Sequence, residues 1–263
     1  MNTHPRTVGD VLRDWRHRRR LSQLDLASLA DISARHLSFI ETGRTHPSRE
    51  MLVRLASSLT LPLRERNALL VAGGFAPLHP ERSWSDRDLA AIRHAVNLVL
   101  TGHEPHPALA LDRAWNLVQA NRAAEFLFEG TVPELLTPPV NVFRLVVHPQ
   151  GLAPRILNLE DVCAVLLARL NHEIDLTGER RLEELRRELM TYPAVRTLRP
   201  GPVGSGGIVV PFVVQVDDTA LRFISTTTVF GTATDVTVEE LTIESFFPAD
   251  ERTALVLRSL QDR

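Results

Sequence analysis

The segment spanning residues 21–44, LSQLDLASLADISARHLSFIETGR, constrains the fold more than any other part of this 263-residue chain. Ser22 and Ser33 each stand before a short run with helical apolar spacing, and serine is a preferred residue at helix N-caps. Gly43 follows the second run, where glycine commonly ends a helix. Asp31 lies between the runs, where a tight turn needs a residue that tolerates a positive φ. The segment therefore predicts two short helices joined by a tight turn.

The interior of such a helix pair needs one small side chain where the helices touch and several apolar ones. Ala27 is the small residue, and the expected inward-facing apolar residues are Leu26, Ile32, Leu37 and Ile40. The same apolar spacing and helix-start signals predict further helices over residues 8–18, 48–59 and 62–72. The N-terminal part of the chain is therefore expected to form an all-α domain of five helices, over residues 1–76.

This pattern resembles the Cro/repressor-type helix-turn-helix of the XRE family, over residues 9–76. The matching residues are Leu-Ser-Gln at 21–23, Ala27, Ser33, Leu37, Ile40, Glu-Thr-Gly at 41–43 and Pro-Ser at 47–48. Asp31 departs from the glycine usual in the family. The resemblance implies a transcriptional regulator that binds double-stranded DNA, with the second helix of the pair in the major groove. A helical protein–protein interaction domain is the alternative.

The resemblance also implies which residues contact DNA. Arg35 is the residue expected to read guanine by a bidentate contact, and Gln23 is expected to bond a phosphate. His36 is expected either at the DNA or simply in solvent. The expected DNA-binding set is Ser22, Gln23, Ser33, Ala34, Arg35, His36, Ser38, Thr42, Arg44 and Arg49. One such module reads few base pairs, so we expect a homodimer on a pseudo-palindromic operator.

The charge of the chain is divided unevenly along its length. Residues 1–70 hold 12 arginines and 7 acidic residues, whereas the remainder holds 18 arginines and 25 acidic residues. A basic block ahead of an acidic remainder is typical of a chain whose first part alone meets a polyanion. An ordinary solvated surface explains the same count equally well.

Several classes of protein are not expected from the composition. The single cysteine, Cys163, cannot form an internal disulfide or a cysteine-based zinc site. The chain shows neither a signal peptide nor an apolar run long enough to span a membrane, so we expect a cytoplasmic protein. The glycine-rich stretch at 201–207 lacks the Lys-Ser/Thr of a phosphate-binding loop. We therefore expect no metal, no catalytic residues and no cofactor of these classes.

The second domain is expected over residues 77–263, with 77–104 as linker and helix. Hairpin strands are predicted at 108–111 and 115–120, and further strands at 208–216, 221–230 and 236–246. Helices are predicted at 121–128, 159–174 and 179–190, and a last one from Pro248. Strands and helices in this order predict an α+β domain with an antiparallel sheet.

This part of the chain resembles the ligand-binding domain of MmyB-like regulators. The resemblance rests on PALALD at 107–112, WNLVQAN at 115–121, NVFR at 141–144 and ESFFPAD at 244–250. It implies a PAS-like fold, in which helices and a sheet enclose an apolar cavity for a fatty-acid-like molecule.

Alternation along the strands predicts which side chains face that cavity. In the last strand, Leu241, Ile243 and Ser245 are expected to face inward, opposite Thr242 and Glu244. Arg144 and Arg155 are the cations expected to meet a ligand carboxylate. The remaining predicted ligand-binding residues are Phe126, Phe143, Phe212, Val214, Leu221, Phe223, Ser225, Thr227 and Val229. A dry core is the simpler explanation of any single one of them.

The sequence thus predicts a DNA-binding transcriptional regulator whose second domain binds a small lipophilic effector. Two alternatives stay open for the second domain. It could serve dimerisation or protein interaction without a ligand, or, less expectedly, act as an enzyme.

Overall fold

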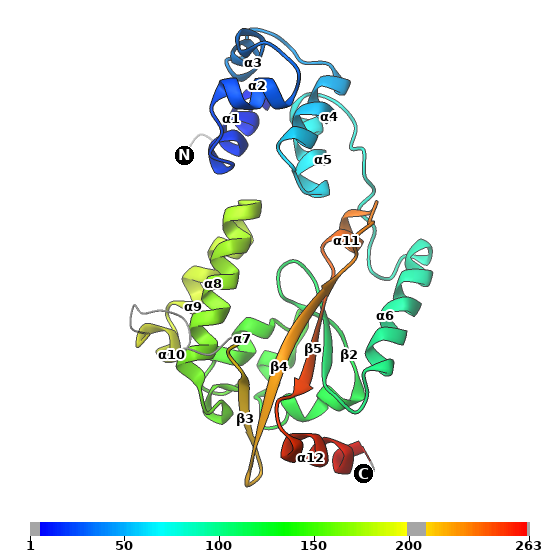
Figure 1. Ribbon diagram of the computed structural model, residues 1–263, viewed down its shortest axis with the longest axis vertical. Coiled ribbons are helices and arrows are strands. Elements are labelled where there is room, and N and C mark those ends of the chain that lie inside the picture. Colours follow the sequence, from blue (N-terminus) through cyan, green and yellow to red (C-terminus); the bar gives the residue numbers. More distant parts are fainter. Residues whose placement is uncertain (1–5, 199–208, 262–263) are drawn as a thin grey trace. The chain divides into compact units, whose positions relative to one another are not determined.

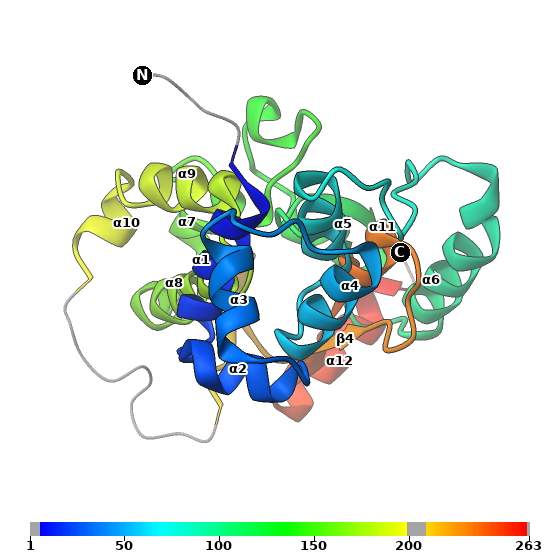
Figure 2. The same ribbon diagram turned by 90° about the horizontal axis from the view of Figure 1, so that it is seen from above.

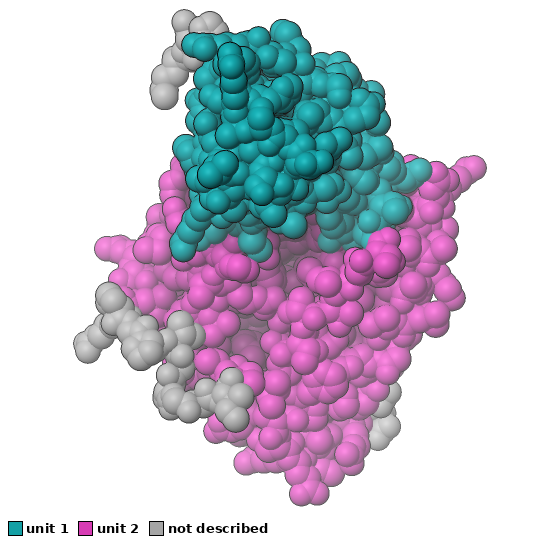
Figure 3. Space-filling view, turned by 45° about the horizontal axis from the view of Figure 1, so that its top comes forward, with its two compact units in different colours: residues 1–82, 175–177, 233–239 teal, residues 83–174, 178–232, 240–263 magenta. Residues whose placement is uncertain are grey.

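The computed structural model describes residues 6–198 and 209–261, and the chain divides into two compact units (Figure 3). Unit 1 comprises residues 1–82, 175–177 and 233–239, and unit 2 comprises residues 83–174, 178–232 and 240–263. The glycine-rich stretch at 201–207 and the first residue of the strand predicted at 208–216 lie outside the described residues.

Unit 1 contains the five predicted helices, namely α1 (Val8–Arg18), α2 (Gln23–Leu29), α3 (Ala34–Glu41), α4 (Arg49–Ser58) and α5 (Leu63–Ala72), and also the short α11 (Val236–Glu239). Their starts follow from capping, because the side chains of Ser22, Ser33 and Ser48 each accept a hydrogen bond from a backbone N–H in the first turn. The turn between α2 and α3 places Asp31 at φ 51°, as its position predicts. The all-α fold expected for this part of the chain is confirmed.

The core of unit 1 lies between these helices. Leu26 and Ala27 from α2 pack with Leu37 and Ile40 from α3, and all four are buried. Gly9 allows α1 to approach the end of α3, because an added Cβ would lie only 2.5 Å from the carbonyl oxygen of Glu41. Ile32, the remaining residue predicted for this interior, is half-buried and packs against the same cluster.

Unit 2 is built on a five-stranded antiparallel sheet with the order β2-β1-β5-β4-β3. The strands are β1 (Ala108–Leu111), β2 (Leu117–Ala120), β3 (Phe212–Val216), β4 (Thr219–Val229) and β5 (Thr242–Pro248). The central strand β5 pairs with β1 on one side and with β4 on the other, where Thr227 lies opposite Glu244. The α+β class predicted for this domain is confirmed.

Helices cover both faces of this sheet (Figure 1). The turn η1 (Arg87–Leu89) leads into α6 (Ala90–Gly102), which packs on one face through Val96 and Leu100. The other face carries the larger core, and Figure 2 shows α7, α8 and α9 grouped together in one part of the view. The elements on that side are η2 (Arg122–Leu127), η3 (Pro133–Leu136), α7 (Val142–Val147), η4 (Ala153–Arg155), α8 (Leu159–Thr177), α9 (Arg180–Leu189) and α10 (Pro193–Arg196).

Three predicted elements differ from the structure. The strand predicted at 208–216 begins only at Phe212. The strand predicted at 236–246 divides into α11 and β5, because the Asp235 carboxylate accepts a hydrogen bond from the N–H of Thr237 and so favours a helical turn. Pro248 ends β5 instead of opening a helix. The last helix, α12 (Glu251–Gln261), follows Asp250, whose carboxylate accepts from the N–H of Thr253 at 2.7 Å.

Candidate functional site

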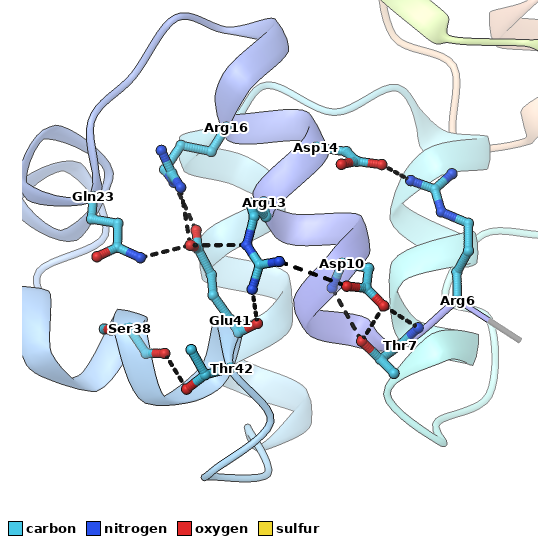
Figure 4. Close-up of polar contacts among 10 residues, drawn as sticks. All are labelled: Arg6, Thr7, Asp10, Arg13, Asp14, Arg16, Gln23, Ser38, Glu41 and Thr42. Atoms are coloured by element: carbon cyan, nitrogen blue, oxygen red, sulfur yellow. Dashed lines mark hydrogen bonds and ion pairs between the residues drawn. The ribbon is translucent and has the colours of Figure 1, made fainter. Parts of the chain in front are cut away.

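The helix pair α2–α3 is held to α1 by a buried carboxylate, that of Glu41 (Figure 4). Arg16 donates to both of its oxygens, at 2.7 and 3.0 Å, and Gln23 donates to Oε2 at 2.7 Å. Burial opposes ionisation of Glu41, but the hydrogen bonds from Arg16 and Gln23 outweigh it and hold the pKa of the carboxyl below its usual value. This network fixes the end of α3 against α1 and α2.

The structure places the predicted DNA-binding residues around α2 and α3. Ser22 and Ser33 are the exposed N-caps of these helices, and Arg35, Thr42 and Arg44 are exposed as well. The half-buried members of the set are Gln23, Ala34, His36, Ser38 and Arg49. The amide of Gln23, predicted to bond a phosphate, donates to Glu41. The hydroxyl of Thr42 donates to the carbonyl of Ser38 at 2.7 Å.

Phe39 is a residue that sequence reasoning missed at this surface. The guanidinium carbon of Arg35 lies 5.3 Å from the centre of the Phe39 ring, and that of Arg44 lies 5.8 Å from it. Both cations are therefore held against one aromatic ring, through contacts that restrict where the two guanidinium groups lie. The signal was present in the sequence, since positions 35 and 39 are four residues apart on one helix face.

Unit 2 contains an apolar cavity of about 110 Å³ between the sheet and the helices of its larger core. Apolar side chains supply most of its wall, with Leu109 from β1, Phe143 from α7 and Val162 from α8 among them. The ring of Trp115 stacks on Phe143 with the ring centroids 4.4 Å apart. The cavity suits an apolar molecule of modest size.

The polar part of the cavity wall consists of Arg169, Ser225 and Glu244. Glu244 is only 6% exposed, although the alternation along its strand predicts that its side chain faces solvent. Nη2 of Arg169 on α8 lies 3.0 Å from Oε2 of this carboxylate, and the guanidinium carbon of Arg169 lies 4.5 Å from the centre of the Trp115 ring. Sequence reasoning missed both charged residues, because they are 75 positions apart and only the fold brings them together.

Three of the predicted ligand-binding residues, Phe143, Phe212 and Ser225, line this cavity. Val214, Leu221 and Phe223 are buried in the core beside it. Phe126 lines a second, more polar hollow of about 410 Å³ with residues such as Glu104 and Leu257. Val229 is 60% exposed and Thr227 is exposed too, so the predicted inward face ends before these two residues of β4.

The two arginines predicted to meet a ligand carboxylate are engaged elsewhere. Arg144 donates twice to Glu188, at 2.7 Å each, and these hydrogen bonds raise the pKa of Arg144. Arg155 donates to the carbonyl oxygens of Phe126, Glu129 and Gln215, at 3.0, 2.7 and 3.2 Å. Neither arginine lines the apolar cavity.

Other sites are not found in the part of the chain that the structure describes. Within residues 6–198 and 209–261, no group of three or more His, Cys, Asp or Glu side chains is arranged to hold a metal ion. No helix in the same ranges is long and apolar enough to cross a membrane. Cys163 is buried, and burial raises the pKa of its thiol to about 11, which makes it a poor nucleophile.

Comparison with known protein families agrees with both units. Residues 7–69 match a family described as a helix-turn-helix domain, and residues 92–260 match the MmyB-like transcription regulator ligand binding domain. A search of curated proteins found no match. Neither matched family is enzymatic. The second match covers well over half of the chain, and the protein therefore belongs to the family of transcription regulators that carry the MmyB-like ligand binding domain.

Proposed function

We propose that the protein binds a pseudo-palindromic operator as a homodimer, and that a small lipophilic effector in the apolar cavity alters its affinity for that operator. In this proposal unit 2 works as a PAS-like sensor in a cytoplasmic regulator. The observation that carries it is the apolar cavity of about 110 Å³ in the unit that matches a ligand binding domain.

The exposed cations around α3 support the DNA-binding half of the proposal. Arg35 and Arg44 are exposed beside Phe39, where they can contact base edges and phosphates. Because arginine–phosphate contacts release counterions, binding is expected to weaken steeply as salt is raised. A single recognition helix reads few base pairs, which is why two copies on half-sites about 34 Å apart are proposed.

Burial of apolar surface supports the effector half. Each methylene group moved from water into the cavity gains about 0.8 kcal/mol, so a short chain can bind with few polar contacts. An effector acts only through different affinities for two states of the protein. We propose that residues 73–104, which connect the domains in sequence, carry that difference to the DNA-binding helices.

Selection of bound duplexes from a random DNA pool, with and without cell lipid extract, tests this function. We expect one enriched motif with two-fold symmetry, and a shift in its affinity when the extract is present. Native mass spectrometry of the purified protein reports a co-purifying lipid directly. Enrichment without any effect of the extract, and no bound compound, would leave unit 2 with a role in dimerisation only.

A further inference from the structure

The charged groups at the cavity neutralise each other. Arg169 Nη1 donates to Glu244 Oε1 at 3.1 Å, and Nη2 donates to Oε2 at 3.0 Å. Thr227 completes the arrangement, since its hydroxyl accepts from Arg169 Nη2 at 3.0 Å and donates to Glu244 Oε2 at 3.2 Å. The cavity wall therefore presents one cation and one anion, already paired, and no surplus charge.

This pairing disfavours a ligand with a charged head. A fatty-acid carboxylate at this position would share one guanidinium with Glu244 and bring two like charges together in a largely apolar site. An ammonium head would meet the same difficulty at Arg169. Displacing Arg169 from this pair would leave the carboxylate of Glu244, which is only 6% exposed, without its counterion, which is costly. Arg144 and Arg155 cannot relieve this, because neither lines the cavity.

An uncharged polar head avoids these costs. A hydroxyl, ester or ketone oxygen needs only one or two hydrogen bonds, and Ser225 brings a hydroxyl to the cavity wall beside the ion pair. At about 10–15 Å³ for each water-sized group, a cavity of about 110 Å³ holds roughly seven to eleven such groups. A medium-length chain fits this space better than a long one.

We propose that the cavity selects an uncharged amphiphile of medium chain length, with one hydrogen-bonding oxygen, over the corresponding fatty-acid anion. This inference rests on the proposed function, in which the cavity holds the effector. It names the chemical class of that effector.

The test compares three probes that differ only in the head group. Octan-1-ol, octanoate and octylammonium are titrated into the full-length protein at neutral pH, with binding followed by calorimetry. We expect saturable binding of octan-1-ol, at least about tenfold tighter than that of either ion, equivalent to about 1.4 kcal/mol. Octanoate or octylammonium binding as tightly as octan-1-ol would overturn the inference.

A charge variant sharpens the test. Glu244→Gln removes the anion and leaves Arg169 with surplus charge, so octanoate should bind at least about tenfold tighter than it does to the native protein. The matched control is Glu188→Gln, which removes the partner of Arg144 away from the cavity and should leave the order of the three probes unchanged. Circular dichroism establishes that each variant is folded. If Glu244→Gln does not fold, the affinities of the three probes for the native protein test the inference on their own.

The outcomes separate the inference from the function on which it rests. Tight octanoate binding by the native protein refutes the selectivity and leaves ligand sensing intact. Failure of all three probes to bind, together with no lipid by native mass spectrometry, refutes ligand sensing itself. If Glu244→Gln keeps the same relative affinities for octan-1-ol and octanoate as the native protein, the role given to the ion pair is refuted.

Discussion

The substitution Glu41→Gln should destabilise the DNA-binding unit far more than its small change in shape suggests. The Glu41 side chain is fully buried and its partner Arg16 is only 7% exposed, so the variant leaves a buried guanidinium without its counterion. Breaking such a pair typically costs about 3–5 kcal/mol. That is a large share of the roughly 5–15 kcal/mol by which a domain is stable.

The same carboxylate sets the direction of the pH dependence. Because the folded protein holds the pKa of Glu41 below its usual value, the ionised form stabilises the native state. This contribution is present in full above the pKa of the unfolded chain and is lost as the pH falls through the lower pKa of the folded protein. The native protein should therefore lose stability at α1–α3 as the pH falls below the ordinary pKa of a glutamate, and Glu41→Gln should lack this part of the pH dependence.

Hydrogen exchange followed by mass spectrometry measures both effects locally, which suits a chain with two units whose unfolding need not be two-state. Peptides from α1–α3 should lose protection in Glu41→Gln. The control is Glu188→Gln, which breaks a half-exposed pair with Arg144 and should cost about 1 kcal/mol or less. Equal losses in the two variants, or unchanged protection of α3 in Glu41→Gln, would refute the role given to the buried pair.

Three further predictions concern DNA binding and assembly. Arg35→Ala should weaken binding to the best DNA site by about 1–3 kcal/mol of free energy and relax the base preference at one position, whereas Arg49→Ala should weaken binding to all sequences more evenly. Selection of bound duplexes from a random pool measures both effects. An unchanged base preference in Arg35→Ala would show that another residue reads the base. Phe39→Leu removes the ring beside Arg35 and Arg44 and should weaken operator binding while leaving the helical circular dichroism unchanged; full operator affinity would mean that the ring does not position these cations. Light scattering at micromolar concentration should give a homodimer, and a monomer bound to one undivided site would contradict the assembly that we propose.

Local signals predicted unit 1 well because its helices are short and individually capped. Ser22, Ser33 and Ser48 mark helix starts, and Asp31 marks the turn with a positive φ. Each of these features depends on residues within a few positions in the chain. The pairing of Arg16 with Glu41 does not, and nothing in the helical spacing indicates it.

The cavity was harder to predict because its polar residues come from distant elements. Alternation along β5 predicts that Glu244 faces solvent, but helices cover both faces of the sheet, so the consecutive residues Ile243, Glu244 and Ser245 are all buried. Only the packing of α8 against the sheet face that carries the larger core shows that Arg169 pairs with the carboxylate of Glu244. Arg144 and Arg155, which the sequence predicts to meet a ligand carboxylate, have hydrogen-bond partners that periodicity does not indicate either.

The central claim is that occupancy of the cavity changes DNA affinity, and an operator titration tests it most directly. Fluorescence anisotropy of a labelled operator is followed as the full-length protein is added, with and without saturating effector from the lipid extract. Allosteric couplings are typically about 1–3 kcal/mol, so we expect the dissociation constant to shift by about five- to 150-fold. Filling the cavity with Val165→Trp should abolish the shift without abolishing DNA binding. An operator affinity that is the same with and without bound effector would contradict the account.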